Sequence, residues 1–268
     1  MITRDGSESH LTAVCPDGSQ KQRLTSDAFD DYQPALSPDR SQIAFLSDRS
    51  SGTMQVHLMD TESGSIRQIT ADLEGADDLV WLPEGDRIAV RAKTGDETWG
   101  WMVVDLDSGE VQPMPGWVRD SSFQPAAFSH DGKRLVYLSS SDQAGRTPPG
   151  KELRIRNRDG SGDSALTPGL WDYRSPVWSL DDRQIAFLSD QDSPGEQFAV
   201  YVVDVDGGSL QQVTHPMFGR AMSLAWSPDG QQLAVNDDQS LYVMALHNGE
   251  MKKLFSLEAP DLMGRLTW

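Results

Sequence analysis

The heptapeptide QIAFLSD occurs twice in this chain, at residues 42–48 and again, unchanged, at residues 184–190. Its recurrence by chance is very improbable at this composition, so the chain contains an internal repeat, which must be resolved before any element is assigned. The two copies lie 142 residues apart. That offset is too long for one repeat unit but close to three units of about 47 residues each. The spacing therefore predicts further, diverged copies of the same unit.

Diverged copies are recognisable because each follows a turn that contains an acidic residue. These acidic residues are Asp39, Glu84, Asp131, Asp181 and Asp229, with successive spacings of 45, 47, 50 and 48 residues. Each copy continues with an apolar run, then a turn rich in Asp, Ser and Gly, then a short last strand, so each unit is predicted to form four strands. The Asp-Gly, Asp-Arg and Glu-Gly pairs of the first turns suit the positive φ that tight hairpin loops require.

A lone four-stranded sheet cannot bury both of its faces, so the copies are expected to stack around an axis as a β-propeller. The first strands carry large apolar residues, and we expect two of these, Trp178 and Trp226, to be core residues. The sequence predicts a single all-β domain, residues 1–268, with six blades of four antiparallel strands. The complete blades are predicted at residues 32–70, 76–114, 123–167, 174–214 and 222–256. Residues 1–25 and 264–268 are expected to share a closing blade, which would remove an exposed sheet edge.

The pattern of SPDG, then IAF and Ser-Asp, then a hydrophobic run, Asp, a Gly turn and Leu-Thr is the PD40 repeat, also called the WD40-like repeat. Over nearly its whole length the chain resembles the propeller of the periplasmic TolB family. The resemblance implies a binding propeller that recognises a protein or peptide, such as an envelope lipoprotein, without catalysing a reaction. It also implies a periplasmic location if an export signal has been removed; otherwise the expected location is cytoplasmic.

The charge of the chain excludes one class of partner. Lys and Arg number 23 against 41 Asp and Glu, for a net charge of −18. Such a chain repels phosphate backbones, so no nucleic-acid partner is expected.

No segment of the sequence approaches about 20 consecutive apolar residues, the length that a membrane span requires. Because Cys15 is the only cysteine, the chain cannot form an internal disulfide. We also expect a monomer.

Catalytic and metal-binding motifs are absent from the sequence. There is no GxSxG nucleophile elbow and no HExxH motif, and the five histidines occupy different places in different blades. We therefore expect no metal, no cofactor and no enzyme activity. The alternative left open is a propeller-type polysaccharide lyase or hydrolase acting on a carbohydrate. The lyases of this kind place His and Gln ligands around a metal at the channel, where this chain offers only His215.

The candidate ligand-binding residues lie in the segments that join the last strand of one blade to the first strand of the next. These segments are expected at one mouth of the central channel, where loops on a rigid scaffold collect binding residues. The candidates are Asp31, Tyr32, Asp78, Trp117, Phe123, Trp171, Tyr173, Arg174, Arg220 and Arg265. Their acidic members come from two adjacent blades and their arginines from the three that follow across the ring. That pattern fits either salt bridges across the channel or the orientation of a dipolar ligand such as a peptide.

Overall fold

The computed structural model describes residues 1–5, 8–25, 28–50, 52–93, 99–114, 124–140, 151–218, 223–237, 239–256 and 266–268. Within these ranges all the regular secondary structure is β-strand, which confirms the predicted all-β class. The chain divides into two compact units. Unit 1 comprises residues 1–121 and 257–267, and unit 2 comprises residues 122–256 and Trp268. The single-domain organisation stays a prediction.

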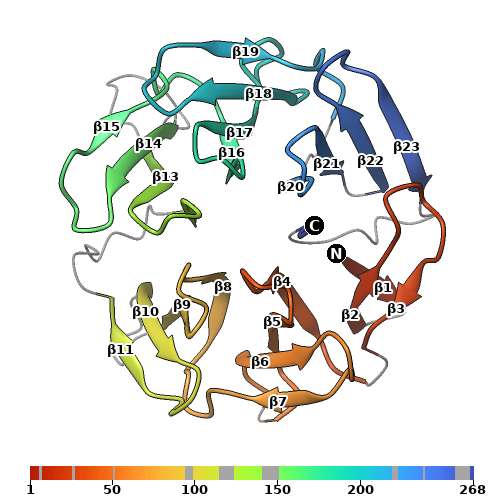
Figure 1. The fold of residues 1–268 in the computed structure, drawn as a ribbon, viewed down its shortest axis with the longest axis vertical. Coiled ribbons are helices and arrows are strands. Elements are labelled where there is room, and N and C mark those ends of the chain that lie inside the picture. Colours follow the sequence, from red (N-terminus) through yellow and green to blue (C-terminus); the bar gives the residue numbers. More distant parts are fainter. Residues whose placement is uncertain are drawn as a thin grey trace. The chain divides into compact units, whose positions relative to one another are not determined.

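Unit 1 contains three antiparallel sheets in which each strand pairs with its neighbour in sequence (Figure 1). The first sheet has three strands, β1 (Ile2–Asp5), β2 (Glu8–Ala13) and β3 (Gln22–Arg23). The second has four strands, β4 (Asp31–Leu36), β5 (Gln42–Ser47), β6 (Gln55–Asp60) and β7 (Ile66–Gln68). The third has β8 (Ala76–Trp81), β9 (Arg87–Lys93), β10 (Trp99–Asp105) and β11 (Val111–Pro113).

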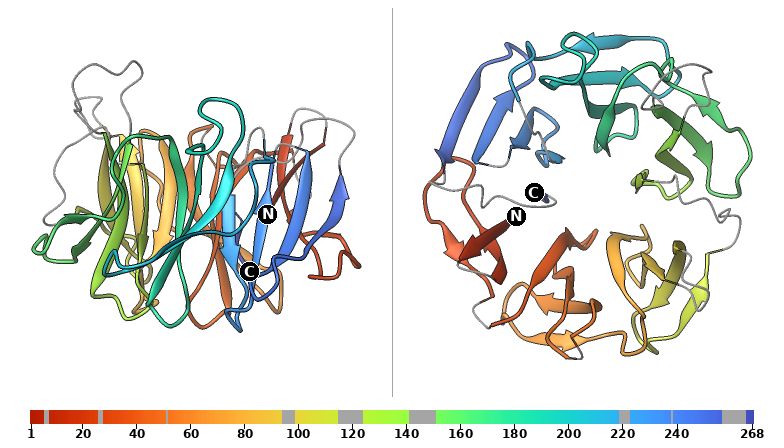
Figure 2. Two further views of the ribbon diagram at one scale, coloured as in Figure 1. Left: turned by 90° about the horizontal axis from the view of Figure 1, so that it is seen from above. Right: turned by 180° about the vertical axis from the view of Figure 1, so that it is seen from behind.

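Unit 2 contains three four-stranded sheets of the same kind, and seen from the side the strands of a sheet run alongside one another (Figure 2). The first sheet has β12 (Gln124–Phe128), β13 (Arg134–Ser140), β14 (Lys151–Asn157) and β15 (Ser164–Ala165). The second has β16 (Tyr173–Trp178), β17 (Gln184–Ser189), β18 (Ala199–Asp204) and β19 (Leu210–Gln212). The third has β20 (Ser223–Trp226), β21 (Gln232–Asn236), β22 (Ser240–Ala245) and β23 (Met251–Ser256). All five four-stranded sheets begin and end within two residues of the predicted blade limits.

The two ends of the chain were expected to share a blade. Strands β1 to β3 supply three strands near the N-terminus. At the other end, residues 266–268 are not part of a strand, and residues 264 and 265 lie outside the described residues. The hydroxyl oxygen of Thr267 accepts a hydrogen bond from the Leu36 N–H of β4 at 3.3 Å. The C-terminal residues therefore contact the first strand of the second sheet of unit 1, and the shared blade stays a prediction.

The turn between the first and second strands has the same hydrogen bonds in four of the five four-stranded sheets. A serine hydroxyl donates to the carboxylate two residues later at 2.5–2.7 Å and accepts from the N–H five residues later at 2.9–3.0 Å. The serines are Ser37, Ser129, Ser179 and Ser227. The residue after the acidic one has a positive φ in all five copies, as predicted from its sequence. These residues are Arg40, Gly85, Gly132, Asp182 and Gly230.

The Leu-Thr pair that ends several copies also has a structural explanation. The buried hydroxyl of Thr70 accepts a hydrogen bond from the N–H of Val56 on β6 at 2.9 Å. Three other threonines accept in the same way from the last strand but one of their own sheet, at 2.9–3.0 Å, namely Thr25, Thr167 and Thr214. Each threonine therefore replaces a backbone acceptor where the short last strand has ended.

Tryptophans on first strands connect neighbouring sheets within each unit. The indole N–H of Trp178 donates to the Ala127 carbonyl of the preceding sheet at 2.9 Å, and Trp226 donates in the same way to Val177 at 3.2 Å. Trp81 of unit 1 repeats the contact to the Ala35 carbonyl at 2.8 Å. Because Trp178 and Trp226 are only 4% and 8% exposed, the prediction that both are core residues is confirmed.

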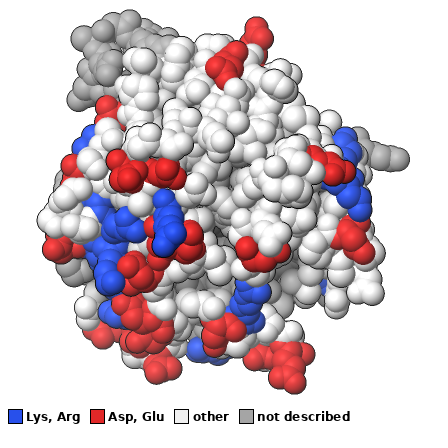
Figure 3. Space-filling model, turned by 45° about the horizontal axis from the view of Figure 1, so that its top comes forward, with Lys and Arg blue, Asp and Glu red and all other residues white. Residues whose placement is uncertain are grey.

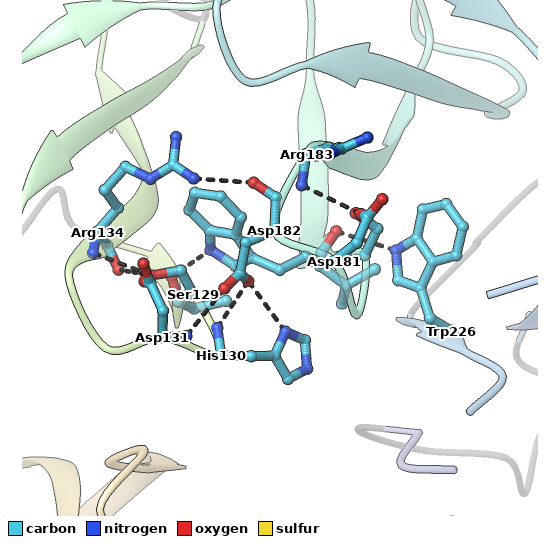
Figure 4. A network of polar contacts seen from close by, with 12 residues as sticks. Ser129, His130, Asp131, Arg134, Asp181, Asp182, Arg183 and Trp226 are labelled. Atoms are coloured by element: carbon cyan, nitrogen blue, oxygen red, sulfur yellow. Dashed lines mark hydrogen bonds and ion pairs between the residues drawn. The ribbon is translucent and has the colours of Figure 1, made fainter. Parts of the chain in front are cut away.

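A second contact between sheets in unit 2 centres on the carboxylate of Asp182 (Figure 4). Its two oxygens accept from the backbone N–H groups of His130 and Asp131 at 2.7 and 2.8 Å, and the imidazole of His130 lies at 3.1 Å. In return, Arg134 donates to the Asp182 carbonyl at 2.8 Å, and its guanidinium lies over the Trp178 ring. The turn of one sheet therefore holds the turn of the next.

The unfolding free energy is expected to decrease in acid because the turn carboxylates are hydrogen-bonded. The Lys133 N–H and the Ser129 hydroxyl lower the pKa of Asp131 from its ordinary value of 3.8 to about 2. The contribution of ionised Asp131 to the free energy of unfolding is therefore complete above about pH 4. It is lost as the pH falls through about 2, because the carboxyl group takes up its proton at a higher pH in the unfolded chain. Urea titrations at several pH values between 5 and 2 measure this loss. The Asp131→Asn variant should lose stability less steeply over that range, and an equally steep loss would contradict the assignment.

Candidate functional site

A group of residues connected by side-chain and backbone contacts lies in unit 2, where β15 leads into β16 and where β18 begins. We call it the Arg174 surface, and it consists of Lys151, Trp171, Asp172, Arg174, Phe198 and Met217. The side chains of Arg174, Lys151 and Asp172 are 41%, 37% and 29% exposed, and Met217 is 43% exposed. The surface therefore combines charged groups with exposed apolar area, which is the composition of many recognition sites.

Backbone contacts fix the loop that carries Trp171 and Asp172. The Lys151 N–H donates to the Trp171 carbonyl at 3.2 Å. The Asp172 N–H donates to the Asp190 carboxylate at 2.9 Å, and the Asp190 N–H returns a bond to the Asp172 carbonyl at 3.3 Å. Asp190 is the last residue of the repeated heptapeptide, and Asp48 makes the same pair of contacts with Asp30 in unit 1. The last residue of the repeat thus anchors the loop ahead of a first strand.

The guanidinium of Arg174 is held by an acid and an aromatic ring. Its Nε and Nη2 donate to one oxygen of Asp172 at 2.9 and 2.6 Å. Its central carbon lies 4.2 Å from the centre of the Phe198 ring, close enough for a cation–π interaction. The other Asp172 oxygen lies 3.2 Å from the Lys151 ammonium nitrogen. Both cations therefore share one carboxylate.

The backbone next to Arg174 is irregular. The pairing of β16 with β17 shifts register between Arg174 and Val177, and Ser175 has a φ of 49°. A β-bulge of this kind redirects the neighbouring side chain, and a non-glycine residue in the left-handed region costs free energy that the surrounding structure must offset. The same irregularity follows Tyr32 in β4, where Gln33 has a φ of 52°. The two predicted site residues Tyr32 and Arg174 thus occupy equivalent positions.

The third predicted residue of this region in unit 2, Tyr173, is fully buried. Its ring meets Phe187 edge-on, with the ring centres 5.7 Å apart. Both rings belong to the core cluster between the first two sheets of unit 2. Tyr173 therefore packs the core beneath the Arg174 surface and presents no side chain to a ligand.

Unit 1 contains the repeat counterpart of residues 171–174 at residues 29–32. Asp31 is fully buried and accepts from the Arg49 guanidinium at 2.8 and 3.1 Å. Tyr32 is partly buried and its hydroxyl accepts from the Ser9 hydroxyl at 3.1 Å. Phe29 stays 38% exposed beside the Arg49 guanidinium. Asp31 is thus part of an internal ion pair.

The remaining predicted residues are less informative. Asp78 is nearly buried, and its carboxylate accepts from the adjacent Leu79 N–H at 2.9 Å. The exposed acid of this strand is Asp77, which pairs with Arg91, whose guanidinium lies over the Trp99 ring. The other four predicted residues lie outside the described residues, namely Trp117, Phe123, Arg220 and Arg265.

Charged side chains in and beside the predicted site form ion pairs within their own unit. Asp31, Asp77 and Arg174 each bond to a partner in the same unit and close in sequence. On the face shown in Figure 3, basic side chains likewise lie beside acidic ones. Among the described ranges, no group of three or more His, Cys, Asp or Glu side chains is placed to hold a metal ion, and no helix there has the length and hydropathy to cross a membrane.

Sequence reasoning missed four members of the Arg174 surface. Asp172 could have been found, because it aligns with Asp30 and each precedes a first strand by the same interval. Lys151, Phe198 and Met217 carry no such signal, since they contact the other members through strand pairing and loop packing. The isolated bridge between Phe198 and Phe218 illustrates this, because it joins residues 20 positions apart.

Comparison with known proteins agrees with this architecture. Residues 100–263, more than half of the chain, match the model of the lipoprotein LpqB beta-propeller domain. TolB from Acinetobacter baumannii superposes with a TM-score of 0.72 at 22% identity, over 94% of this chain and 60% of that one. Oligogalacturonate lyase from Vibrio parahaemolyticus gives a TM-score of 0.61 at 16% identity, over 92% of this chain and 85% of the lyase. These similarities confirm the predicted TolB-like β-propeller fold.

Two curated relatives correct one prediction. The uncharacterized peptidase YuxL of Bacillus subtilis is 30% identical over 52% of this chain, and dipeptidyl-peptidase 5 of Porphyromonas endodontalis is 33% identical over 51%. The chain spans about one fifth of the length of each. The prediction that this protein is not an enzyme was wrong, because both relatives are named peptidases. That prediction considered only the motifs within this chain, whereas the relatives are longer proteins.

Proposed function

Because this chain belongs to the lipoprotein LpqB β-propeller domain family, we propose that it binds a polypeptide through the Arg174 surface. The observation that carries the proposal is the exposed guanidinium of Arg174, stacked on Phe198, whose backbone carbonyl bonds to the exposed Met217, and three residues after Trp171. The names of the two curated relatives add support, since a peptidase must bind polypeptide. Similarity to the lyase is one of fold alone and adds no support for a carbohydrate ligand.

The residues of the Arg174 surface contribute to recognition in different ways. Trp171 and Met217 supply apolar contact area, which contributes most where water is excluded. Arg174 and Lys151 supply charged hydrogen-bond donors that orient the ligand. Because Phe198 and Asp172 already hold the guanidinium, little side-chain entropy is lost when the ligand binds.

The proposal includes the setting of the protein. We place it in the cell envelope, because the family description is that of a lipoprotein domain and the matched structures include TolB. We also propose that it is a monomer. The expected partner is a protein or peptide of the same compartment.

A second candidate function is favoured by the relatives named as peptidases. In that case the bound polypeptide is a substrate, and the Arg174 surface selects it for cleavage. Incubation with chromogenic dipeptide anilides and with unfolded protein, followed by detection of released dipeptides, distinguishes this candidate from binding alone.

Binding is tested with fluorescent peptide mixtures and the Trp171→Ala variant. We expect saturable binding to the parent protein and a loss of at least about 1 kcal/mol, roughly fivefold in Kd, in the variant. The matched control is Trp99→Ala, which removes another partly exposed tryptophan that lies beside an arginine, in unit 1. Thermal melts verify that both variants fold. Absence of peptide binding to the folded parent protein, or binding of oligogalacturonate in its place, would overturn the proposal.

A further inference from the structure

We propose that the Arg174 surface recognises the C-terminal carboxylate of a polypeptide whose last side chain is apolar. This inference rests on the proposed function and adds the chemical group that is bound and the end of the polypeptide that carries it.

The donors of Arg174 are only partly used within the protein. A guanidinium has five N–H groups, and its edges present them in pairs that match a carboxylate. Asp172 occupies the pair formed by Nε and Nη2. Nη1 has no hydrogen-bond partner among the described residues, so the pair formed by Nη1 and the second Nη2 hydrogen is available for another carboxylate.

The charges around Arg174 favour an anion at that position. Among the exposed side chains, the cations of Arg174 and Lys151 outnumber the single carboxylate of Asp172. Asp190 lies nearby but is 7% exposed, and its two oxygens accept from the N–H groups of Asp172 and Gly195. The rest of the chain carries a large negative charge. A free carboxylate is therefore attracted only at close range, because salt screens exposed charges beyond about 8–10 Å.

The apolar residues beside Arg174 favour a chain terminus over an acidic side chain. Trp171 lies one residue before Asp172, and the Met217 N–H bonds at 3.2 Å to the carbonyl of Phe198, the residue on whose ring the guanidinium is stacked. An α-carboxylate is one bond from the Cα that carries the last side chain. A terminal residue can therefore place its carboxylate on Arg174 and an apolar side chain against Trp171 or Met217.

The test uses two fluorescent peptide mixtures with apolar last residues that are identical except that one ends in a free carboxylate and the other in an amide. Anisotropy titrations should show that amidation weakens binding to the parent protein by about tenfold or more, the loss expected for a charged hydrogen-bonded pair. Arg174→Gln should remove the difference between the mixtures. Arg174→Lys keeps the charge but loses the paired donors, so it should reduce the difference without abolishing it.

The matched control is Arg154→Gln on β14. Arg154 lies in the same unit and pairs with Glu152 and Asp163, so its loss should leave the amidation effect unchanged. Equal affinity for the two mixtures, with binding that still depends on Trp171, would overturn this inference and leave the proposed function intact. A third mixture with an internal Asp and an amidated end should bind as weakly as the second. Binding as tight as that of the free carboxylate would assign Arg174 to acidic side chains and overturn the inference.

Discussion

Replacing Trp178 by alanine is expected to decrease the free energy of unfolding by about 3–5 kcal/mol, the range measured for large aromatic residues in cores. Trp178 packs in the core cluster between two sheets of unit 2, and its indole N–H bonds to Ala127. The substitution removes the packing, leaves a cavity and leaves the Ala127 carbonyl without this donor. Urea unfolding followed by far-ultraviolet circular dichroism measures the change.

Two further variants separate the causes of this loss. Trp178→Phe keeps an aromatic ring but lacks the N–H, so it should cost less than Trp178→Ala. Trp171→Ala removes a partly buried indole at the edge of the same cluster, and it should cost less again. A Trp178→Ala variant that unfolds at the same urea concentration as the parent protein would show that the contact between these sheets contributes nothing to stability.

Replacing Asp31 by alanine is expected to decrease the free energy of unfolding by a similar amount, about 3–5 kcal/mol, because it leaves a buried charge without its partner. Asp31 is fully buried and Arg49 is 13% exposed. The guanidinium also lies 5.2 Å from the Phe45 ring centre, which fixes it against the core. Unfolding in urea at neutral pH, in low and moderate salt, measures the effect.

The double variant Asp31→Leu/Arg49→Met provides the control. It removes both charges, so it should be much more stable than Asp31→Ala and close to the parent protein. This experiment also decides the role of Asp31, which the sequence predicted to bind ligand. A stable Asp31→Ala variant with weakened peptide binding would restore that role and contradict the ion-pair interpretation.

The site predicted from the sequence and the Arg174 surface share a general location but differ in which residues are exposed. In the four-residue segment 171–174, which leads into β16, the sequence alone favoured Trp171, Tyr173 and Arg174 equally. The structure buries Tyr173 and leaves Arg174 exposed. The reason is the alternation of side chains along a strand, combined with the bulge after Arg174 that resets it.

The relatives named as peptidases limit what a motif search can establish. GxSxG and HExxH describe particular catalytic arrangements, and their absence from this chain says nothing about activities of the longer proteins in which the repeat also occurs. The repeat therefore predicts fold with much greater specificity than function.

The architecture could be predicted from the repeat because the residues that define each copy act within one sheet. The Ser and Asp of the first turn, the positive φ after them and the Thr of the last strand make hydrogen bonds within one sheet. Sequence alone could therefore place the limits of the five four-stranded sheets to within two residues. It also identified the tryptophans as core residues, because they recur at one position of the repeat.

Contacts between copies were decided only by the tertiary structure. The position of the Asp182 carboxylate at the turn of the preceding sheet depends on how two sheets pack. The same is true of the Arg174 surface, where the Arg174 guanidinium lies over Phe198 and shares the Asp172 carboxylate with Lys151, so that three segments of the chain meet. Hydrogen bonds and ion pairs between segments depend on distances of a few ångströms between side chains. The spacing of residues along a repeat does not predict those distances.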